Sequence, residues 1–217
     1  MRIVVTAGPT REPIDPVRYL SNRSSGKMGY ALAQAALESG HEVTLISGPT
    51  ALERPQGAKF VPVTTSDEMF NAVHEHVLNC NVLVMCAAVS DYKPMRVATQ
   101  KLEKQTGAFA LELTATQDIL ASLAHDERAY FVVGFAAQTH DLEANARRKL
   151  ISKNCDMIVA NDVSRSDRGM ESDENEVTIF FRDQEPRVIS RAPKIVIARE
   201  ILKIVFEFAK KTLTKNF

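Results

Sequence analysis

Apolar and amphipathic stretches alternate along the first half of the chain. Continuous apolar runs rich in β-branched residues predict buried strands, whereas apolar positions three and four residues apart predict helices. On these patterns we expect strands at 2–8, 41–48, 58–63 and 81–89, and helices at 27–38 and about 67–78. Parallel neighbours need a crossover element between them, so this alternation favours a parallel, doubly wound sheet. We therefore expect an α/β, Rossmann-like fold.

Two residues refine the boundaries of these elements. Pro62 lies inside the run at 58–63, and proline has no amide hydrogen for a ladder, so this strand is expected to be short or at a sheet edge. Ser66 precedes the helix at 67–78 and is its expected N-cap. The run at 81–89 is apolar throughout, which is typical of a central strand covered on both faces.

The second half of the chain continues the sheet and then closes it. We expect strands at 130–137 and 155–162, a helix at 142–152, an antiparallel hairpin at 175–181 and 186–190, and a long closing helix at 192–213. Residues 90–116 break the alternation with two short strand-like pieces and a charged middle, which we interpret as a flap. The whole chain, 1–217, is expected to be one domain.

Composition narrows the classes of function. The 217 residues include 27 Lys plus Arg and 27 Asp plus Glu, so the formal net charge is zero, which argues against nucleic-acid binding through bulk charge. The three cysteines form no CxxC, which favours reduced thiols over a disulfide framework. The chain has neither a signal-peptide pattern nor an apolar run long enough to span a membrane. We expect a cytoplasmic protein that binds neither nucleic acid nor membrane.

Small and polar residues gather directly after the predicted strands. The first strand runs into a stretch ending in Gly26 and Lys27, and later strands run into "AAVSDYKP", "FAAQT" and "ANDVS". In an open parallel sheet these positions share the carboxyl edge, where ligands bind. Ordinary loops are also polar, but the repeated small residues would let a ligand approach the backbone.

The stretch before the first helix is the strongest local signal for a binding site. A helix N-terminus presents unpaired amides and the positive end of the helix dipole. Ser24, Ser25 and Gly26 would add hydroxyls and open backbone, and Arg23 and Lys27 would add charge. The stretch therefore predicts an anion site of the phosphate-binding type. An ordinary serine N-cap with basic neighbours is the alternative.

Other catalytic signatures are missing from the sequence. No G-x-G-x-x-G follows the first strand, no acidic residue ends the second, and no tyrosine has a lysine four residues later, so a nicotinamide-dependent reductase stays an alternative by fold alone. No serine or cysteine stands in a nucleophile motif. Lys149 and Lys153 lie four residues apart at a helix end, and Lys101 and Lys104 lie in the flap, where they could meet phosphate.

Five blocks carry a resemblance to a known family. In order and spacing, "TAGPTREPIDPVRYLSNRSSGKMGYALA", "AAVSDYKP", "VGFAAQT", "IVANDV" and "SDENEV" resemble phosphopantothenoylcysteine synthetase. In many bacteria that domain follows a flavin-dependent decarboxylase domain in one chain. The resemblance covers nearly the whole sequence and leaves no counterpart of the flavin domain. It therefore implies a free-standing synthetase or an isolated domain without flavin, with a separate decarboxylase as a candidate partner.

The resemblance implies a ligase of coenzyme A biosynthesis. Members of the family join 4′-phosphopantothenate to cysteine, with CTP as the usual nucleotide in bacteria and ATP in eukaryotes. The substrate carboxylate attacks the α-phosphate and releases pyrophosphate; the cysteine amine then attacks the acyl-nucleotide and releases the nucleoside monophosphate. A divalent cation, usually Mg²⁺, assists. The family forms dimers, so a homodimer is expected.

The resemblance also assigns roles to residues. Asn22 would orient the acyl-nucleotide, and Lys101 would hold the triphosphate, so these two are the expected catalytic residues. The expected nucleotide-binding residues are Ser24, Ser25, Gly26, Ala88, Asp91, Lys101, Thr116, Gln117, Asp118, Ile119, Phe135, Lys149 and Lys153. The expected substrate-binding residues are Asn22, Arg23, Ala137 and Asn161. The flap would close over the intermediate and exclude water. No residue is assigned to the metal.

Several positions depart from the family pattern. Glu103 stands where the flap is commonly basic, Gln138 where glutamate is common, and Met170 where phenylalanine is usual. Thr116 and Gln117 replace a common Asn-Pro pair, which leaves the choice between CTP and ATP open. Beside the ligase, two alternatives remain: a nicotinamide-dependent reductase on a similar sheet, and a non-catalytic nucleotide-binding module.

Overall fold

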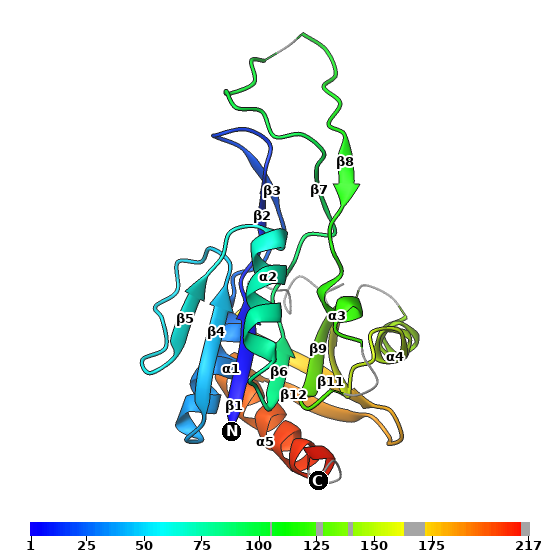
Figure 1. The fold of residues 1–217 in the computed structure, drawn as a ribbon. Helices are drawn as coiled ribbons and strands as arrows, with labels where there is room; N and C mark the ends of the chain where they lie inside the picture. The colour runs from blue at the N-terminus through cyan, green and yellow to red at the C-terminus, as the bar shows by residue number, and fades with distance from the viewer. Residues whose placement is uncertain (105, 125–127, 139–140, 163–171, 214–217) are drawn as a thin grey trace.

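The structure is a computed structural model that describes residues 1–104, 106–124, 128–138, 141–162 and 172–213. Within these ranges an eight-stranded sheet forms the centre of the molecule (Figure 1). Its strands are β1 (Arg2–Ala7), β4 (Glu42–Ser47), β5 (Lys59–Pro62), β6 (Val82–Met85), β9 (Phe131–Gln138), β10 (Met157–Asp162), β11 (Glu174–Phe181) and β12 (Arg187–Pro193). The helices are α1 (Lys27–Glu38), α2 (Ser66–Val77), α3 (Ile119–Ser122), α4 (Leu142–Ser152) and α5 (Lys194–Leu213).

The sheet is mostly parallel, as the alternation of strands and helices predicts. Its order is β12-β11-β10-β9-β6-β1-β4-β5, and every pair from β10 to β5 is parallel. β11 and β12 add an antiparallel hairpin at one edge. β5, which contains Pro62, lies at the other edge, and β6 lies near the centre. The expected α/β, Rossmann-like fold with a C-terminal hairpin is therefore confirmed.

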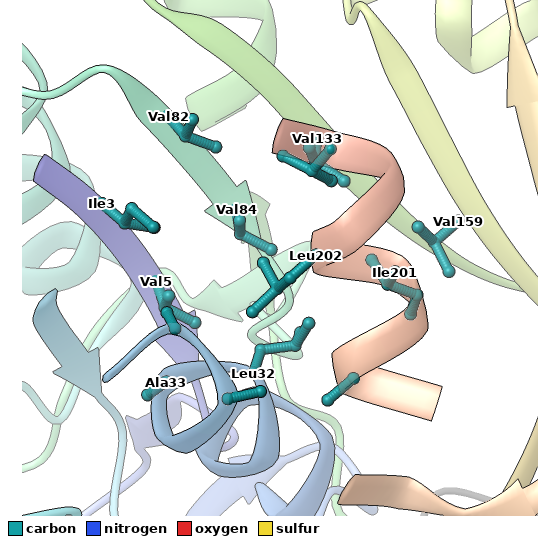
Figure 2. Packing of buried hydrophobic residues seen from close by; sticks show 14 of the residues in the cluster. Ile3, Val5, Leu32, Ala33, Val82, Val84, Val133, Val159, Ile201 and Leu202 are labelled. Atoms are coloured by element: carbon teal, nitrogen blue, oxygen red, sulfur yellow. The ribbon is translucent and has the colours of Figure 1, made fainter. Parts of the chain in front are cut away.

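Helices cover both faces of the sheet because the strand side chains alternate between faces. On one face, Ile3 and Val5 belong to a buried cluster with Leu32 of α1 and with Ile201 and Leu202 of α5 (Figure 2). On the other face, Val4 packs in a second cluster together with side chains of α2 and α4. The two apolar layers fix the sheet and hold the N-terminus of α1 at the carboxyl edge of β1.

The N-cap of α2 differs from the sequence expectation. Thr65, not Ser66, caps the helix: its hydroxyl accepts a hydrogen bond from the Glu68 amide at 3.2 Å, and the Glu68 carboxylate accepts one from the Thr65 amide at 3.2 Å. This reciprocal capping box satisfies two amides at once. Ser66 is the first helical residue, and its amide and hydroxyl both donate to the buried carboxylate of Glu12.

Two small antiparallel hairpins stand outside the sheet. One pairs β2 (Arg11–Pro13) with β3 (Tyr19–Ser21), and the other pairs β7 (Tyr92–Pro94) with β8 (Leu113–Ala115) at the base of the predicted flap. Figure 1 shows both projecting beyond the carboxyl edge of the sheet, with the flap extending furthest. Among the described residues, no helix combines the length and apolar character needed to cross a membrane.

Candidate functional site

A pocket of about 680 Å³ opens at the carboxyl edge of the parallel strands. Because β1, β6 and β9 run in one direction, the loops that follow them meet there. Most of the residues singled out by the sequence line this pocket. They are Asn22, Ser24, Gly26, Ala88, Asp91, Thr116, Gln117, Asp118, Ile119, Phe135, Ala137, Lys149, Lys153 and Asn161.

The N-terminus of α1 forms one wall of the pocket. Gly26 is the N-cap, with a φ of 77°, and a Cβ added there would lie 2.7 Å from Thr50 Cγ2, so glycine is required. No side chain caps the helix and no acidic residue lies in its first turn, so an ordinary serine N-cap is wrong. The Ser24 hydroxyl accepts only a long bond, 3.4 Å, from the Gly26 amide. The wall therefore offers amides and the positive end of a helix dipole to an anion.

Asn22 lies at the mouth of the pocket in a defined orientation. Its Nδ2 donates to the backbone oxygens of Ala88, at 3.1 Å, and Val89, at 3.2 Å. Both amide hydrogens are thus directed at the loop after β6. The acceptor that Asn22 can offer to a ligand is Oδ1, which has two lone pairs.

The loop after β6 is held by a buried hydroxyl network. Thr10 Oγ1 donates to Ser90 Oγ at 3.3 Å and accepts from the Ser90 amide at 3.0 Å, and both residues are buried. Thr116 Oγ1 donates to the backbone oxygen of Ser90 at 2.6 Å, and the Thr116 amide donates to the backbone oxygen of Asp91 at 3.0 Å. These bonds fix the backbone on both sides of Asp91, whose exposed carboxylate lines the pocket.

Asp118 and Lys153 form an ion pair at the opposite wall. Asp118 also caps α3, because its Oδ1 accepts a hydrogen bond from the Ala121 amide at 2.9 Å. Burial acts to raise the pKa of Asp118, but the hydrogen bonds from Lys153 and Ala121 outweigh it, and the net pKa is lowered. Lys149 lies one turn before Lys153 and lines the same wall, so this end of the pocket is cationic.

The structure adds pocket residues that the sequence analysis did not select. They include Lys194, Asn175 and Cys86. Lys194 is 6% exposed, and burial and the charge of Lys27 lower its pKa. A signal for Lys194 was present, because a lysine at the first residue of a helix opposes the helix dipole and needs another reason to be there. Lys27 itself is paired with Asp173 at 2.6 Å.

Three predicted residues are not part of the pocket lining. Lys101 is exposed on the flap, Arg23 is exposed beside Asn22, and Ser25 accepts a long hydrogen bond from the Lys27 amide at 3.5 Å. Of the departures from the family pattern, Glu103 is exposed on the flap near Lys101. Met170 lies outside the described residues, and Gln138 is described only as the last residue of β9.

The cysteines do not offer a reactive nucleophile, and the described acidic and histidine side chains do not cluster as metal ligands. Burial raises the pKa of Cys86 to about 12, and the pKa values of Cys80 and Cys155 are raised to about 12 for the same reason. These thiols are protonated at neutral pH and are poor nucleophiles. Across the ranges that the structure describes, no group of three His, Cys, Asp or Glu side chains could hold a metal ion.

The chain is similar to proteins that are named for coenzyme A biosynthesis. Residues 1–208 match the family model described as the DNA/pantothenate metabolism flavoprotein C-terminal domain. The chain is 46% identical over 211 residues to the coenzyme A biosynthesis bifunctional protein CoaBC of Bacillus subtilis (strain 168), an alignment that covers 97% of this chain and 52% of the relative. The chain thus spans about half the length of the curated relatives it matches.

Solved structures share the fold over almost the whole chain. The crystal structure of the C-terminal domain of a CoaBC protein superposes with a TM-score of 0.82 at 41% identity, and covers 97% of this chain and 96% of that domain. A Cab2 mutant in complex with phosphopantothenate-cysteine superposes with a TM-score of 0.80 at 16% identity, covering 99% of this chain and 88% of the other. At 16% identity, the similarity to the Cab2 mutant establishes a shared fold and nothing more.

Proposed function

The chain belongs to the family of DNA/pantothenate metabolism flavoprotein C-terminal domains, and we propose that it is a phosphopantothenate–cysteine ligase of coenzyme A biosynthesis. The observation that carries this proposal is the pocket, which unites the open N-terminus of α1, the oriented Asn22 and lysines on two walls. Relatives named for coenzyme A biosynthesis support the pathway, and a Cab2 mutant with this fold binds phosphopantothenate-cysteine.

In the first half-reaction the carboxylate of 4′-phosphopantothenate attacks the α-phosphate of the nucleotide. A P–O bond to the acyl oxygen forms, the bond to the β-phosphate oxygen breaks, and pyrophosphate leaves with the electron pair. This step needs positioned cations and amides more than a protein nucleophile. The α1 amides and the walls carrying Lys149, Lys153 and Lys194 supply these groups.

In the second half-reaction the cysteine amine attacks the acyl carbon. The C–N bond forms, the acyl–oxygen bond breaks, and the nucleoside monophosphate leaves while the amine loses a proton. Asn22 Oδ1 accepts a hydrogen bond from the attacking amine, because Nδ2 is already directed at Ala88 and Val89. Asn22 thereby orients the amine as positive charge develops on its nitrogen.

The nucleotide base lies between the loop after β6 and the α3 wall. Asp91 accepts a hydrogen bond from an exocyclic amine of the base, and the partly buried ring of Phe135 lines the same space. CTP is the proposed nucleotide, with ATP as the competitor. Mg²⁺ usually binds through substrate phosphates and water with one or two carboxylates, which suits a chain whose described residues form no three-ligand cluster. When bound, Mg²⁺ neutralises phosphate charge.

A homodimer is part of the proposal. Seven of the eleven large hydrophobic side chains exposed in the described structure lie on the two projecting hairpins and the flap: Val17, Tyr19, Tyr92, Met95, Val97, Phe109 and Leu113. Such a concentration is typical of an interaction surface. A second copy of the chain covers this surface in the proposal.

The test is the formation of the amide product. The chain is incubated with 4′-phosphopantothenate, cysteine and Mg²⁺, with CTP and ATP in separate reactions, and the products are identified by mass spectrometry. We expect phosphopantothenoylcysteine together with the nucleoside monophosphate, in equal amounts. If neither nucleotide gives the amide while the chain still binds nucleotide, the function is that of a non-catalytic nucleotide-binding module.

A further inference from the structure

The pocket has a second cationic end, away from the lysines of α4. Lys149 and Lys153 lie on α4, which packs on the same face of the sheet as Val4. Lys194 lies at the start of α5, which packs with α1 on the other face (Figure 2). Because the pocket spans the carboxyl edge between the two faces, its two cationic ends can bind different groups.

The β11–β12 hairpin brings two buried polar residues to this second end. β11 begins and β12 ends at the carboxyl edge of the parallel strands, because each runs antiparallel to the strand before it. The ladder pairs Asn175 with Ala192, and the Lys194 amide donates to the backbone oxygen of Asp173 at 3.0 Å. Asn175 and Lys194 therefore lie close together across the hairpin. Both line the pocket, and they are only 5% and 6% exposed.

Asn175 presents a hydrogen-bond donor at this end of the pocket. Its Oδ1 accepts from the Glu176 amide at 3.0 Å, which fixes the orientation of the side-chain amide. Within the described residues no other hydrogen bond engages this side chain, so Nδ2 keeps its hydrogens for a ligand. Buried polar groups are nearly always hydrogen-bonded, so a donor left over in the wall of a pocket points to an acceptor on a bound molecule.

The charge at this end suits a ligand with a single negative charge. Among the charged side chains described here, Lys27 forms an ion pair with Asp173 at 2.6 Å, so these two charges cancel. Lys194 then adds one positive charge that water screens little, and burial lowers its pKa. One ammonium group and one amide group match the two oxygens of a carboxylate. A phosphate dianion would leave an excess negative charge in the same space.

The apolar side chains near Lys194 suit a thiol. Met28, Cys86 and Phe135 line the pocket and pack with the core layer between the sheet and the helices α1 and α5. The charge of Lys194 acts on the Cys86 thiol, which shows that the two side chains are near each other. Sulfur makes favourable contacts with aromatic rings and packs well in irregular apolar spaces. This end therefore matches a small molecule that carries a carboxylate and a thiol.

We propose that Lys194 and Asn175 bind the α-carboxylate of the cysteine substrate and so place its amine for attack on the acyl carbon. The proposal rests on the proposed function, and it adds a binding site for the amino acid at the α5 end of the pocket. Lys194 donates to one carboxylate oxygen and Asn175 Nδ2 to the other, while the thiol lies against Met28, Cys86 and Phe135. After pyrophosphate has left, the carboxylate replaces phosphate as the anion beside Lys194.

Cysteamine, which is cysteine without the carboxylate, tests this contact. The chain receives 4′-phosphopantothenate, nucleotide and Mg²⁺ together with both amines, cysteamine in excess, and the two amide products are measured by mass spectrometry. Their ratio, corrected for the amine concentrations, gives the preference for cysteine. Both amines compete for the same acyl-nucleotide, so any effect of a substitution on the first half-reaction cancels. We expect a wild-type preference of at least about 100-fold, because a site built around a polar contact rejects an analogue that lacks it.

Lys194→Met removes the charge and keeps an unbranched side chain. We expect the preference to fall at least about 30-fold, as when one partner of a buried charge pair is lost. Lys194→Arg keeps the charge and should retain most of the preference. A merely structural defect would slow both amines alike and leave their ratio unchanged. Lys203→Met, at an exposed position of the same helix, is the matched control and should alter neither the ratio nor the rate.

Asn175→Asp tests the second contact with little change of shape. The new carboxylate can still accept from the Glu176 amide, but it replaces the donor with an oxygen that repels the cysteine carboxylate. We expect the preference to fall at least about 10-fold, which is the loss of one hydrogen bond to a charged group, while cysteamine is still converted.

Three results would overturn the proposal and leave the ligase in place. They are a wild-type chain that uses both amines equally well, a Lys194→Met chain with the wild-type ratio, and an Asn175→Asp chain with the wild-type ratio. A Lys194→Met chain that is slower but keeps the ratio would assign Lys194 to the nucleotide or to phosphopantothenate. A wild-type chain that forms no amide with either amine would instead overturn the proposed function, and this inference with it.

Discussion

At the scale of single residues, two hydrogen bonds to backbone oxygens determine which atom of Asn22 can contact a ligand. Its Nδ2 is directed at Ala88 and Val89, so the side chain reaches a ligand as an acceptor. Burial limits the pocket thiol in a different way: it raises the pKa of Cys86 to about 12, so the thiol is protonated at neutral pH and is a poor nucleophile. In the proposed reaction, the side chains of this site therefore orient the substrates and neutralise their charge, and the new bonds form between the substrates.

Asn22→Asp tests the orientation. A carboxylate would face the oxygens of Ala88 and Val89 without a hydrogen to donate and would repel phosphate. We expect turnover to fall at least about 100-fold, in the range seen when one positioned hydrogen-bonding group is lost. Rapid quenching should show acyl-nucleotide that is poorly converted to amide.

The matched control is Asn81→Asp. Asn81 Oδ1 accepts from the Arg2 amide at 2.8 Å, and a carboxylate keeps that bond. Its turnover should equal that of wild type. Normal turnover of the Asn22 variant would remove Asn22 from the mechanism.

At the scale of elements, close packing of α1 against β1 brings the helix N-terminus to the pocket. Gly29 makes this approach possible: a Cβ there would lie 2.6 Å from Ala7 Cβ and 3.0 Å from the Thr6 oxygen. The contact is with a rigid central strand, so the helix would have to move. The position of the α1 wall of the pocket therefore depends on Gly29, which has no side chain to contact a ligand.

Gly29→Ala should displace the start of α1. Overpacking of this kind costs about 1–3 kcal/mol of stability. We expect nucleotide affinity to fall by more than this loss of stability, measured from the urea midpoint, can explain. Calorimetric titration and urea unfolding measure the two effects. Gln34→Ala, a substitution on the same helix at a residue that donates to Glu38, should leave nucleotide affinity unchanged. Unaltered affinity in Gly29→Ala would contradict the assignment of α1 to the pocket.

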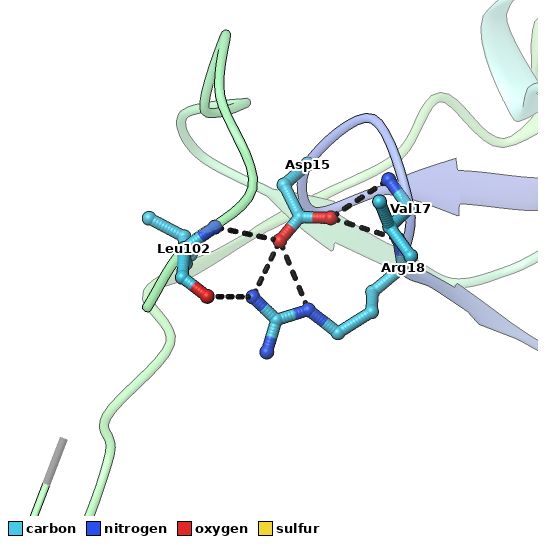
Figure 3. Close-up of polar contacts among 4 residues, drawn as sticks. All are labelled: Asp15, Val17, Arg18 and Leu102. Atoms are coloured by element: carbon cyan, nitrogen blue, oxygen red, sulfur yellow. Dashed lines mark hydrogen bonds and ion pairs between the residues drawn. The ribbon is translucent and has the colours of Figure 1, made fainter. Parts of the chain in front are cut away.

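The contacts of Asp15 and Arg18 with Leu102 link the turn between β2 and β3 to the flap, and their contribution to stability should depend on pH in acid (Figure 3). Hydrogen bonding from Arg18 holds the pKa of the Asp15 carboxyl well below its usual range. A carboxylate with a lowered folded-state pKa adds stability that is fully present above its unfolded pKa and is lost as the pH falls through the folded value. The difference in urea midpoint between wild type and Asp15→Asn should therefore be constant from pH 7 to about 4.5 and shrink below about pH 4. A difference that grows in acid would contradict this account.

The strands of the sheet could be predicted because their apolar runs are local signals. The β2–β3 hairpin could not, because Pro13, Asp15 and Pro16 break any alternating pattern and its partners, such as Ser66, lie more than fifty residues away. The pocket followed from the rule that parallel strands share a carboxyl edge. The place of Lys101 did not follow, because the contacts that fasten the flap join residues over eighty positions apart.

At the scale of the whole molecule, the β2–β3 hairpin, the β7–β8 hairpin and the flap, which we call the arms, carry the exposed apolar side chains through which we propose that two copies of the chain associate. Met95→Glu with Val97→Glu places two charges among side chains that are 56% and 52% exposed in the single chain. If the arms join two copies, burying these charges is costly and the dimer should dissociate, with ligase activity falling in parallel. Light scattering and turnover, measured over one concentration series, report both.

Leu78→Glu is the control for the arms. Leu78 is 80% exposed at the end of α2, on the body of the molecule, and its substitution should leave both mass and rate unchanged. A chain that is dimeric with both arm substitutions in place would show that the arms are not the interface.

The measurement that tests the account most directly is pyrophosphate release by the wild-type chain with 4′-phosphopantothenate and Mg²⁺. CTP and ATP are run in parallel, each with and without cysteine. We predict release that requires phosphopantothenate, proceeds faster with one nucleotide, stops near one equivalent per pocket without cysteine and becomes continuous when cysteine is added. Absence of release with both nucleotides, or release that does not require phosphopantothenate, would contradict the account.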